Sequence, residues 1–227
     1  MKEKIGIVGL GRLGDNLAKY FPAETELFVC DRDASTVLSC AAKYHRSCEE
    51  LEHIVGELDY IFICVPPTEV RGLLEKYADQ IKKNAVVVNM ATSVDSEELA
   101  KVFEGCQMEI VPLKPIAEGY ALSRELKGVF ITSPKALAHV EKLSYLFQDM
   151  GDIIIGKEME VQQINETATA FALKFYHDLA EELARFSIPV EGINAAIKSV
   201  AVGTILDYPP NKYNYYIDQI KKKYFIQ

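Results

Sequence analysis

The chain has 227 residues, of which 49% are hydrophobic and 26% are charged, and its formal net charge is −8. This length and apolar content are typical of one large or two modest domains with their own cores. The acidic balance argues against a nucleic-acid partner, because proteins that bind the phosphate backbone usually present a basic surface. We expect no membrane partner and no signal peptide, because no apolar run is long enough to span a bilayer and a strand pattern begins by residue 4.

The five cysteines are odd in number and form no C-x-x-C pair. Cys30 and Cys64 lie in apolar strand patterns, where a free thiol behaves as a small hydrophobic side chain. We therefore expect reduced thiols and a cytoplasmic location. No group of histidines, cysteines or carboxylates has the spacing of metal ligands, so we predict no metal site.

In the first half of the chain, β-branched and apolar runs alternate with helical patterns, as a parallel sheet with crossover helices requires. We expect strands at 4–9, 26–30, 60–65, 85–89, 107–111, 128–132 and 152–156. We expect helices near 12–21, 34–45, 69–82, 95–103 and 135–149. These elements predict one α/β domain over residues 1–156.

After residue 156 the pattern becomes helical. Apolar residues spaced by three and four predict one long amphipathic helix over about 158–187 and a second at about 190–206. The tyrosine-rich tail is expected to hold a further short helix after Pro209 and Pro210. We predict a small all-helical domain at 157–227, and a homodimer formed through residues 158–206, because so long an apolar helix needs a packing partner.

Within the first predicted strand and helix, Gly9, Gly11 and Gly14 form the pattern G-x-G-x-x-G. The first glycine suits a tight turn, the second lets the backbone approach a pyrophosphate, and the third lets helix and strand pack closely. Free amides and the positive end of the helix dipole then face the phosphates. The motif predicts a doubly wound Rossmann sheet followed by a small all-helical C-terminal domain. The expected cofactor contacts in this turn are Gly9, Leu10, Gly11, Arg12, Leu13 and Gly14.

Asp31 follows the second predicted strand, where a carboxylate accepts hydrogen bonds from the ribose hydroxyls of NAD and repels the extra phosphate of NADP. Its neighbour Arg32 is suited to stack on adenine or to pair with a 2′-phosphate. The cofactor is therefore predicted as NAD or NADP, with NAD favoured. Asp31 is also suited to a turn or to the N-cap of the next helix.

Two further strand ends are expected at the same edge of the sheet, where open α/β sheets bind ligands. We expect Val65, Pro66 and Pro67 to form a rigid wall beside the cofactor. Asn89, Met90 and Ala91 are expected near the nicotinamide. The alternatives are that the prolines only terminate a strand and that Asn89 only caps a turn.

The glycine motif, the Val65-Pro66-Pro67 strand end, the segment from Val111 to Pro115 and the C-terminal helices together resemble the pyrroline-5-carboxylate reductase family. Its wider group includes deazaflavin-linked NADP reductases, 6-phosphogluconate dehydrogenases and β-hydroxyacid dehydrogenases. The resemblance implies hydride transfer between a nicotinamide and an imine or carbonyl carbon of a small carboxylate substrate. It also implies a dimer made by the C-terminal helices.

The resemblance also bears on single residues. Pro112 and Pro115 resemble the prolines of a Met-Pro-Asn-x-Pro segment that lies beside the substrate, with Leu113 in place of the asparagine. Lys114 in this loop is a candidate to bind a substrate carboxylate. The reductase's substrate-binding Ser-Gly-Ser-Gly-Pro-Ala is replaced by residues 165–170, where Thr167 keeps one hydroxyl, and proline biosynthesis is therefore in doubt.

A second comparison concerns Lys174 and Asp178, which resemble the lysine and asparagine of the Lys-x-x-His-Asn motif in 6-phosphogluconate dehydrogenases. There the lysine acts as acid or base, so Lys174 is a candidate proton donor. Because Asp178 replaces the asparagine, an ordinary surface pair one helical turn apart is the alternative. Three functions therefore stay open: a reductase-like oxidoreductase, a dehydrogenase that uses Lys174, and a catalytically silent dinucleotide-sensing protein.

Overall fold

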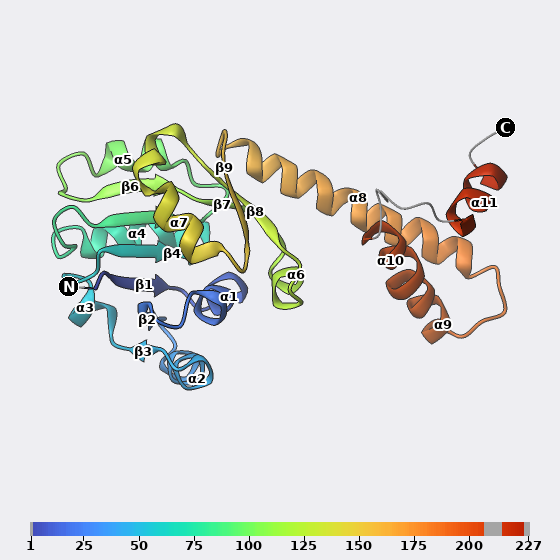
Figure 1. The fold of residues 1–227 in the computed structure, drawn as a ribbon, viewed down its shortest axis with the longest axis horizontal. Coiled ribbons are helices and arrows are strands. Elements are labelled where there is room, and N and C mark those ends of the chain that lie inside the picture. Colours follow the sequence, from blue (N-terminus) through green and yellow to red (C-terminus); the bar gives the residue numbers. More distant parts are fainter. Residues whose placement is uncertain (1, 207–214, 225–227) are drawn as a thin grey trace. The chain divides into compact units, whose positions relative to one another are not determined.

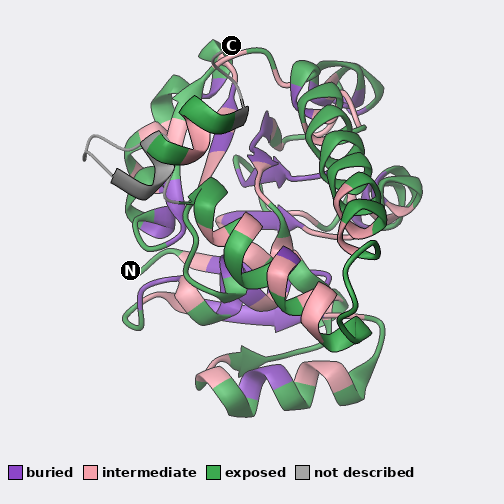
Figure 2. Cartoon of the chain, turned by 90° about the vertical axis from the view of Figure 1, so that its right-hand side faces the viewer, coloured by how far each residue is buried: buried purple, intermediate pink, exposed green. Residues whose placement is uncertain are grey.

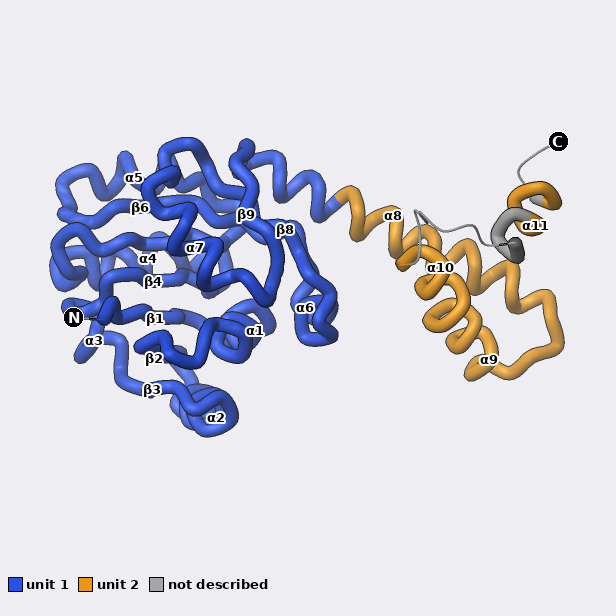
Figure 3. Tube along the Cα trace, viewed as in Figure 1, with its two compact units in different colours: residues 1–166 blue, residues 167–227 orange. Residues whose placement is uncertain are grey.

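The structure is a computed structural model that describes residues 2–206 and 215–224. The chain divides into two compact units, Met1–Glu166 and Thr167–Gln227, which Figure 3 colours blue and orange. The division falls inside a long helix, later than the sequence predicted. The reason is that the first turns of this helix are anchored in the first unit: Val161 is fully buried, and the Asn165 amide donates to the carbonyl oxygen of Pro115 at 2.9 Å.

In the described part of the first unit, six strands form a parallel sheet in the order β3-β2-β1-β4-β5-β6 (Figure 1). These strands are β1 (Lys4–Val8), β2 (Glu26–Cys30), β3 (Ser47–Cys48), β4 (Tyr60–Ile63), β5 (Val86–Asn89) and β6 (Glu109–Pro112). Strand β1 pairs with β2 on one side and β4 on the other, so the strand order reverses beside β1. Such a reversal opens a crevice at the carboxyl ends of the strands.

Helices cover both faces of this sheet, which is therefore doubly wound as predicted. On one face lie α1 (Arg12–Tyr20), α2 (Ala34–Tyr44) and α7 (Val140–Phe147), and on the other lie α3 (Leu51–Ile54), α4 (Pro67–Tyr77) and α5 (Ser96–Val102). A hydrophobic core lies on each face of the sheet, and successive residues of β4 point into opposite cores. Phe62 packs with α1 and α7, whereas Ile61 and Ile63 pack with α4. Figure 2 shows the strands as buried purple ribbons between helices with exposed outer faces.

A second sheet, with three strands in the described residues, follows the first. Strand β7 (Lys114–Ile116) pairs antiparallel with β8 (Gly128–Thr132), and β8 pairs parallel with β9 (Gly151–Ile155). The sequence predicted the strands at 128–132 and 152–156 but not β7, a short edge strand with a proline at its centre. Two helical segments complete the unit: α6 (Gly119–Ser123) and the 3₁₀ turn η1 (Pro134–His139), which leads into α7.

The regular elements of the second unit are all helices in the part of it that the structure describes. Helix α8 (Glu160–Leu183) enters it, and α9 (Val190–Ala195), the π-helical η2 (Ala196–Ala201) and α10 (Val202–Leu206) follow without a break. These segments confirm the two helices predicted for this region. The tail forms α11 (Tyr215–Tyr224), whereas Pro209 and Pro210 lie outside the described residues. None of the described helices combines the length and apolar character needed to cross a membrane.

Candidate functional site

At two positions of the turn between β1 and α1, the surrounding backbone leaves room only for glycine. Gly9 has a φ of +95°, in the left-handed region, and a Cβ there would lie 2.8 Å from the carbonyl carbon of Cys64. A Cβ on Gly14 would lie 1.9 Å from the carbonyl oxygen of Gly9, so only glycine lets α1 pack this closely on the turn. The first and third glycines of the motif are therefore required by the fold of this turn, whether or not a ligand is bound.

The middle glycine has a different reason. Gly11 has an ordinary extended conformation (φ −65°), and a Cβ built on it would meet no protein atom within 4 Å. Gly11 is also the N-cap of α1 and offers no side chain to cap the first turn, so the helix presents backbone amides to this open space. The free space and the amide donors together fit a pyrophosphate held on a helix N-terminus.

A cavity of about 1100 Å³ adjoins the turn at the carboxyl ends of β1, β2 and β4. Six of the residues predicted to contact the cofactor line it: Gly9, Gly11, Asp31, Arg32, Val65 and Pro66. Apolar side chains of α2 and α4, Leu38 and Leu73 among them, form part of its walls. The cavity is large enough for the adenosine half of a dinucleotide.

The ribose side of this cavity is acidic. Asp31 is fixed by two backbone amides, because its carboxylate accepts from the amides of Leu10 (2.6 Å) and Asp33 (3.0 Å). Arg32, the residue suited to a 2′-phosphate, forms an ion pair with Glu69 of α4 instead, with 3.2 Å between the guanidinium nitrogen and the carboxylate oxygen. Both residues line the cavity. Three more carboxylates line the same cavity: Glu49, Glu50 and Glu52.

Comparison with known families decides the assignment. Residues 4–165 match the model of the NAD binding domain of 6-phosphogluconate dehydrogenase. The chain belongs to this family. The family model is that of an NAD-binding domain, so NAD or NADP is the cofactor of this chain. The reductase-like resemblance seen in the sequence falls within the same group.

One curated relative matches part of the chain, and solved structures agree with the fold over most of it. ComE operon protein 4 of Bacillus subtilis is 26% identical over 117 residues, which make up 48% of this chain and only 42% of that curated protein. A pyrroline-5-carboxylate reductase from Coxiella burnetii superposes with a TM-score of 0.75 at 13% identity, over 97% of this chain and 85% of the reductase. An imine reductase variant from Myxococcus stipitatus in complex with NAD+ gives 0.63 at 16%, over 98% and 78% of the two chains.

The other predicted residues of the turn in this NAD-binding domain do not line the cavity. Leu10 is buried in the core, and Leu13 packs against it. Arg12 turns outward, where it pairs with Glu118 at 3.1 Å and lies 4.7 Å from the ring centroid of Tyr120. Pro67 is the first residue of α4. Contact of these residues with the cofactor through their backbones stays a prediction.

Asn89 directs its side chain into the loop that follows β5, and its predicted position near the nicotinamide stays a prediction. The amide is fully buried; it donates to the carbonyl oxygen of Val94 (3.0 Å) and to Oγ of Ser96 (2.9 Å), and it accepts from the amide of Ala91 (3.1 Å). Met90 and Ala91 are buried as well. The alternative from the sequence, that Asn89 organises a turn, describes the structure better.

Lys114 points into the protein rather than outward, and its predicted contact with a substrate stays a prediction. Its side chain is 0% exposed, and its ammonium donates to the carbonyl oxygens of Ala91 (2.7 Å) and Val94 (2.8 Å) and pairs with Glu158 at 3.3 Å. An ammonium has three protons, and all three are used inside the protein. Burial lowers the pKa of Lys114 from 10.5 to about 8, because desolvation outweighs the attraction of Glu158.

The two candidate residues of the second unit lie on α8. Lys174 is 71% exposed and pairs with Asp178 one turn along the helix, as the surface-pair alternative predicted. Thr167 is exposed. Within the described residues of this unit, neither side chain has the buried, polar surroundings that tune a catalytic group.

Sequence reasoning missed Glu158 and the acidic rim of the cavity. Glu158 carries no recognisable motif, and only the fold brings it to Lys114. At the rim, Glu50, Glu52 and His53 place three ligand atoms within 4.8 Å of one another. All three side chains are exposed, and exposed carboxylates often gather in this way, so we assign no metal to them.

Proposed function

We propose that the protein catalyses hydride transfer between a nicotinamide cofactor and the imine or carbonyl carbon of a small carboxylate substrate, as a pyrroline-5-carboxylate reductase-like enzyme. The observation that carries the proposal is the open space at Gly11, on the uncapped start of α1 and beside the acidic cavity. Solved proteins of similar fold support the reaction class: they include the Coxiella reductase and a 3-hydroxyisobutyrate dehydrogenase from Mycobacterium tuberculosis with L-serine.

In this proposal the cofactor supplies the hydride, and the chain supplies binding and orientation. The turn at residues 9–14 binds the pyrophosphate, Asp31 accepts from the ribose, and Val65 with Pro66 forms an apolar wall that excludes water. Lys114 takes no part as an acid, because its protons are used internally. Calorimetric titration with NADH and NADPH, followed by turnover assays on cyclic imines and on 2- and 3-hydroxy acids, tests the proposal. A protein that binds neither dinucleotide would contradict it.

A dinucleotide sensor without chemistry is the second candidate, because Lys114, the polar residue expected to face a substrate, is sealed inside the protein. Tight NADH binding with no turnover on the whole substrate panel would favour this sensor. A dehydrogenase that uses Lys174 is tested by Lys174→Met, which should abolish turnover if that residue donates a proton. We also propose a cytoplasmic location, which the five free cysteines support.

We expect the protein to bind NADH at least about tenfold more tightly than NADPH, a difference of ~1.4 kcal/mol. A 2′-phosphate would approach Asp31 and the acidic rim, whereas Arg32 is already paired with Glu69. Asp31→Asn should lower the ratio of the affinity for NADH to the affinity for NADPH. Fluorescence titration with each cofactor measures this ratio. Asp33→Asn is the matched control, because Asp33 caps α2 and does not line the cavity, and asparagine caps a helix equally well. Tighter binding of NADPH by the unaltered protein would overturn the assignment of NAD.

We propose further that the second unit is completed by a second copy of the chain. Among its described residues, Ile197 is the one buried hydrophobic side chain. Many large apolar side chains are exposed, Phe171 at 72%, and Figure 2 shows these helices mostly in green and pink. The exposed set comprises Phe171, Leu173, Phe175, Tyr176, Phe186, Ile188, Val190, Val200, Val202, Ile205 and Leu206. An apolar surface of this kind on a soluble protein is typical of an interface.

The dimer makes a direct prediction. The unaltered protein should sediment as a dimer at micromolar concentration, and Phe171→Glu should shift it toward the monomer by placing a charge in the apolar interface. Lys157→Glu, a charge change at an exposed position outside residues 158–206, is the control and should leave the dimer intact. A monomer in the unaltered protein would refute the interface.

A further inference from the structure

Hydrogen bonds from a cluster of buried polar side chains fix the loop between β5 and α5, residues 90–95. Lys114 on β7 donates to two of its carbonyl oxygens, those of Ala91 and Val94. Asn89, at the end of β5, donates to the same carbonyl oxygen of Val94 and accepts from the amide of Ala91. Both ends of the loop are therefore fixed by side chains that contact no solvent.

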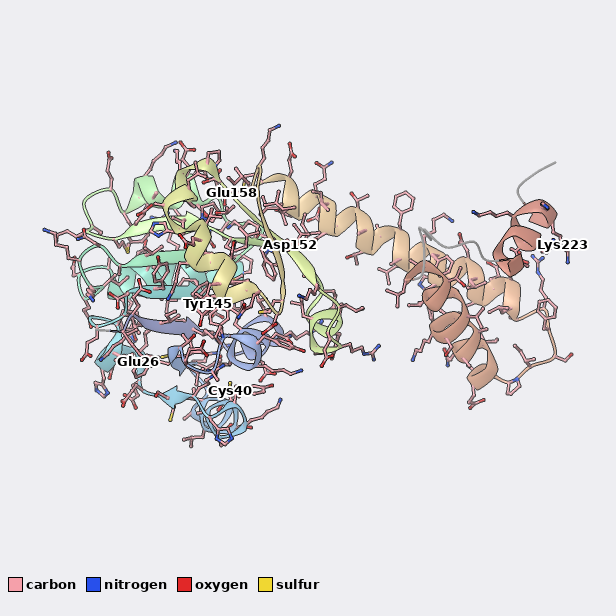
Figure 4. The ribbon with its side chains drawn as sticks, in the orientation of Figure 1. Glu26, Cys40, Tyr145, Asp152, Glu158 and Lys223 are labelled. Atoms are coloured by element: carbon pink, nitrogen blue, oxygen red, sulfur yellow. The ribbon has the colours of Figure 1, made fainter. Side chains whose placement is uncertain are left out.

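Glu158 closes the cluster from the segment that precedes α8, where Figure 4 labels it. Its carboxylate pairs with Lys114 at 3.3 Å and accepts from Oγ of Ser96 at 2.8 Å and from the Ser96 amide at 3.2 Å. Ser96 is the first residue of α5. The first turn of α5, the loop before it and strand β7 are thus joined through one buried ion pair.

Stability alone is a poor explanation for this arrangement. Removing two charges from water costs several kcal/mol each, and well-packed apolar side chains of similar size are often equally stabilising. The lowered pKa of Lys114 indicates that desolvation is only partly offset by Glu158. An ion pair that stabilises so little, yet fixes the loop through two bonds from Lys114 and the start of α5 through Glu158, is better explained by the shape of that loop.

The loop lies where the second half of the cofactor must pass. Asp31 and the cavity place the adenosine half over β2, and a dinucleotide extends across the reversal of strand order toward the far side of β1. On that side the strands are β4 and then β5, and residues 90–95 follow the carboxyl end of β5. This inference rests on the proposed function.

We propose that Lys114 and Glu158 are positioning residues that hold residues 90–95 in the shape that receives the nicotinamide half of the cofactor. They touch neither cofactor nor substrate. Lys114 fixes the positions of the two loop carbonyl groups by hydrogen bonds. Glu158 fixes the position of the Lys114 ammonium and of the first residue of α5. The role differs from the substrate-binding one that the sequence suggested for Lys114.

The test separates the two halves of the cofactor. Affinities for NADH and for ADP-ribose, which lacks the nicotinamide, are measured by calorimetry on the full chain and on Glu158→Gln. We expect NADH to bind about tenfold more weakly to the variant, while ADP-ribose affinity stays within twofold. Ser96→Ala, a smaller change in the same cluster, should act in the same direction by about threefold and serves if Glu158→Gln does not fold.

Glu160→Gln is the matched control, because Glu160 forms an exposed pair with Lys157 just beyond the cluster. It should change neither affinity. Equal losses for NADH and ADP-ribose in Glu158→Gln, or no loss for either, would overturn the positioning role. Failure of the unaltered protein to bind either compound would instead refute the proposed function, so the two failures are distinguishable.

Discussion

Gly11→Val is expected to lower the affinity for NADH at least about 100-fold, or ~2.7 kcal/mol, without unfolding the protein. A Cβ built on Gly11 meets no protein atom within 4 Å, and the backbone conformation there suits any residue, so we expect the fold to accept valine. The side chain would instead occupy the space in which the pyrophosphate approaches the amides of α1. Calorimetric titration with NADH and a thermal melt measure the two quantities separately.

Two further substitutions are compared with Gly11→Val. Gly105→Val is the control, because a Cβ there also meets nothing within 4 Å and Gly105 does not line the cavity, so binding should be unchanged. Gly14→Ala should instead destabilise the protein, because its Cβ would lie 1.9 Å from the Gly9 carbonyl oxygen. Retention of NADH affinity in Gly11→Val would show that no pyrophosphate is bound at this turn.

The contrast between these glycines explains why the cofactor turn was readable from the sequence. The requirement is local: a tight turn, a close approach and an open helix start all depend on residues within one short segment. Strands β2 and β8 were likewise predicted with their observed bounds, because each is a short, mainly apolar run of residues.

Short elements could not be predicted in the same way. Strand β7 has three residues with Pro115 at its centre, and proline is tolerated there because β7 pairs on one side only, with β8. Strand β3 has two residues, and α3 and α6 have four and five. Windows this short carry no periodicity, so tertiary contacts decide their conformation.

The inward direction of the Lys114 and Asn89 side chains could not be predicted for a related reason. The sequence placed both residues correctly near the carboxyl edge of the sheet, but it does not say whether a side chain points outward to a ligand or inward to the loop. Glu158, which decides the matter for Lys114, is far along the chain and belongs to no motif. The division of the two units inside α8 has the same origin, because an apolar stripe does not reveal which surface it packs on.

Lys114 should make the stability of the protein depend on pH. Its pKa is about 8 in the folded protein and near 10.5 in the unfolded chain, so between these values the unfolded chain binds more protons. Stability contributed at this site should therefore rise with pH across that window and be lowest below pH 8, where the buried amine is charged. The rise should be on the order of 1 to 3 kcal/mol, because each pKa unit corresponds to about 1.4 kcal/mol.

The measurement compares the unaltered protein with Lys114→Met by urea unfolding from pH 7 to 10 at one protein concentration. Methionine fills a similar volume but does not titrate. The pH dependence of the difference in unfolding free energy between the two proteins therefore reports on Lys114. That difference should move in favour of the unaltered protein as pH rises. A flat or opposite trend would mean that Lys114 keeps an ordinary pKa and that burial of the ion pair carries little cost.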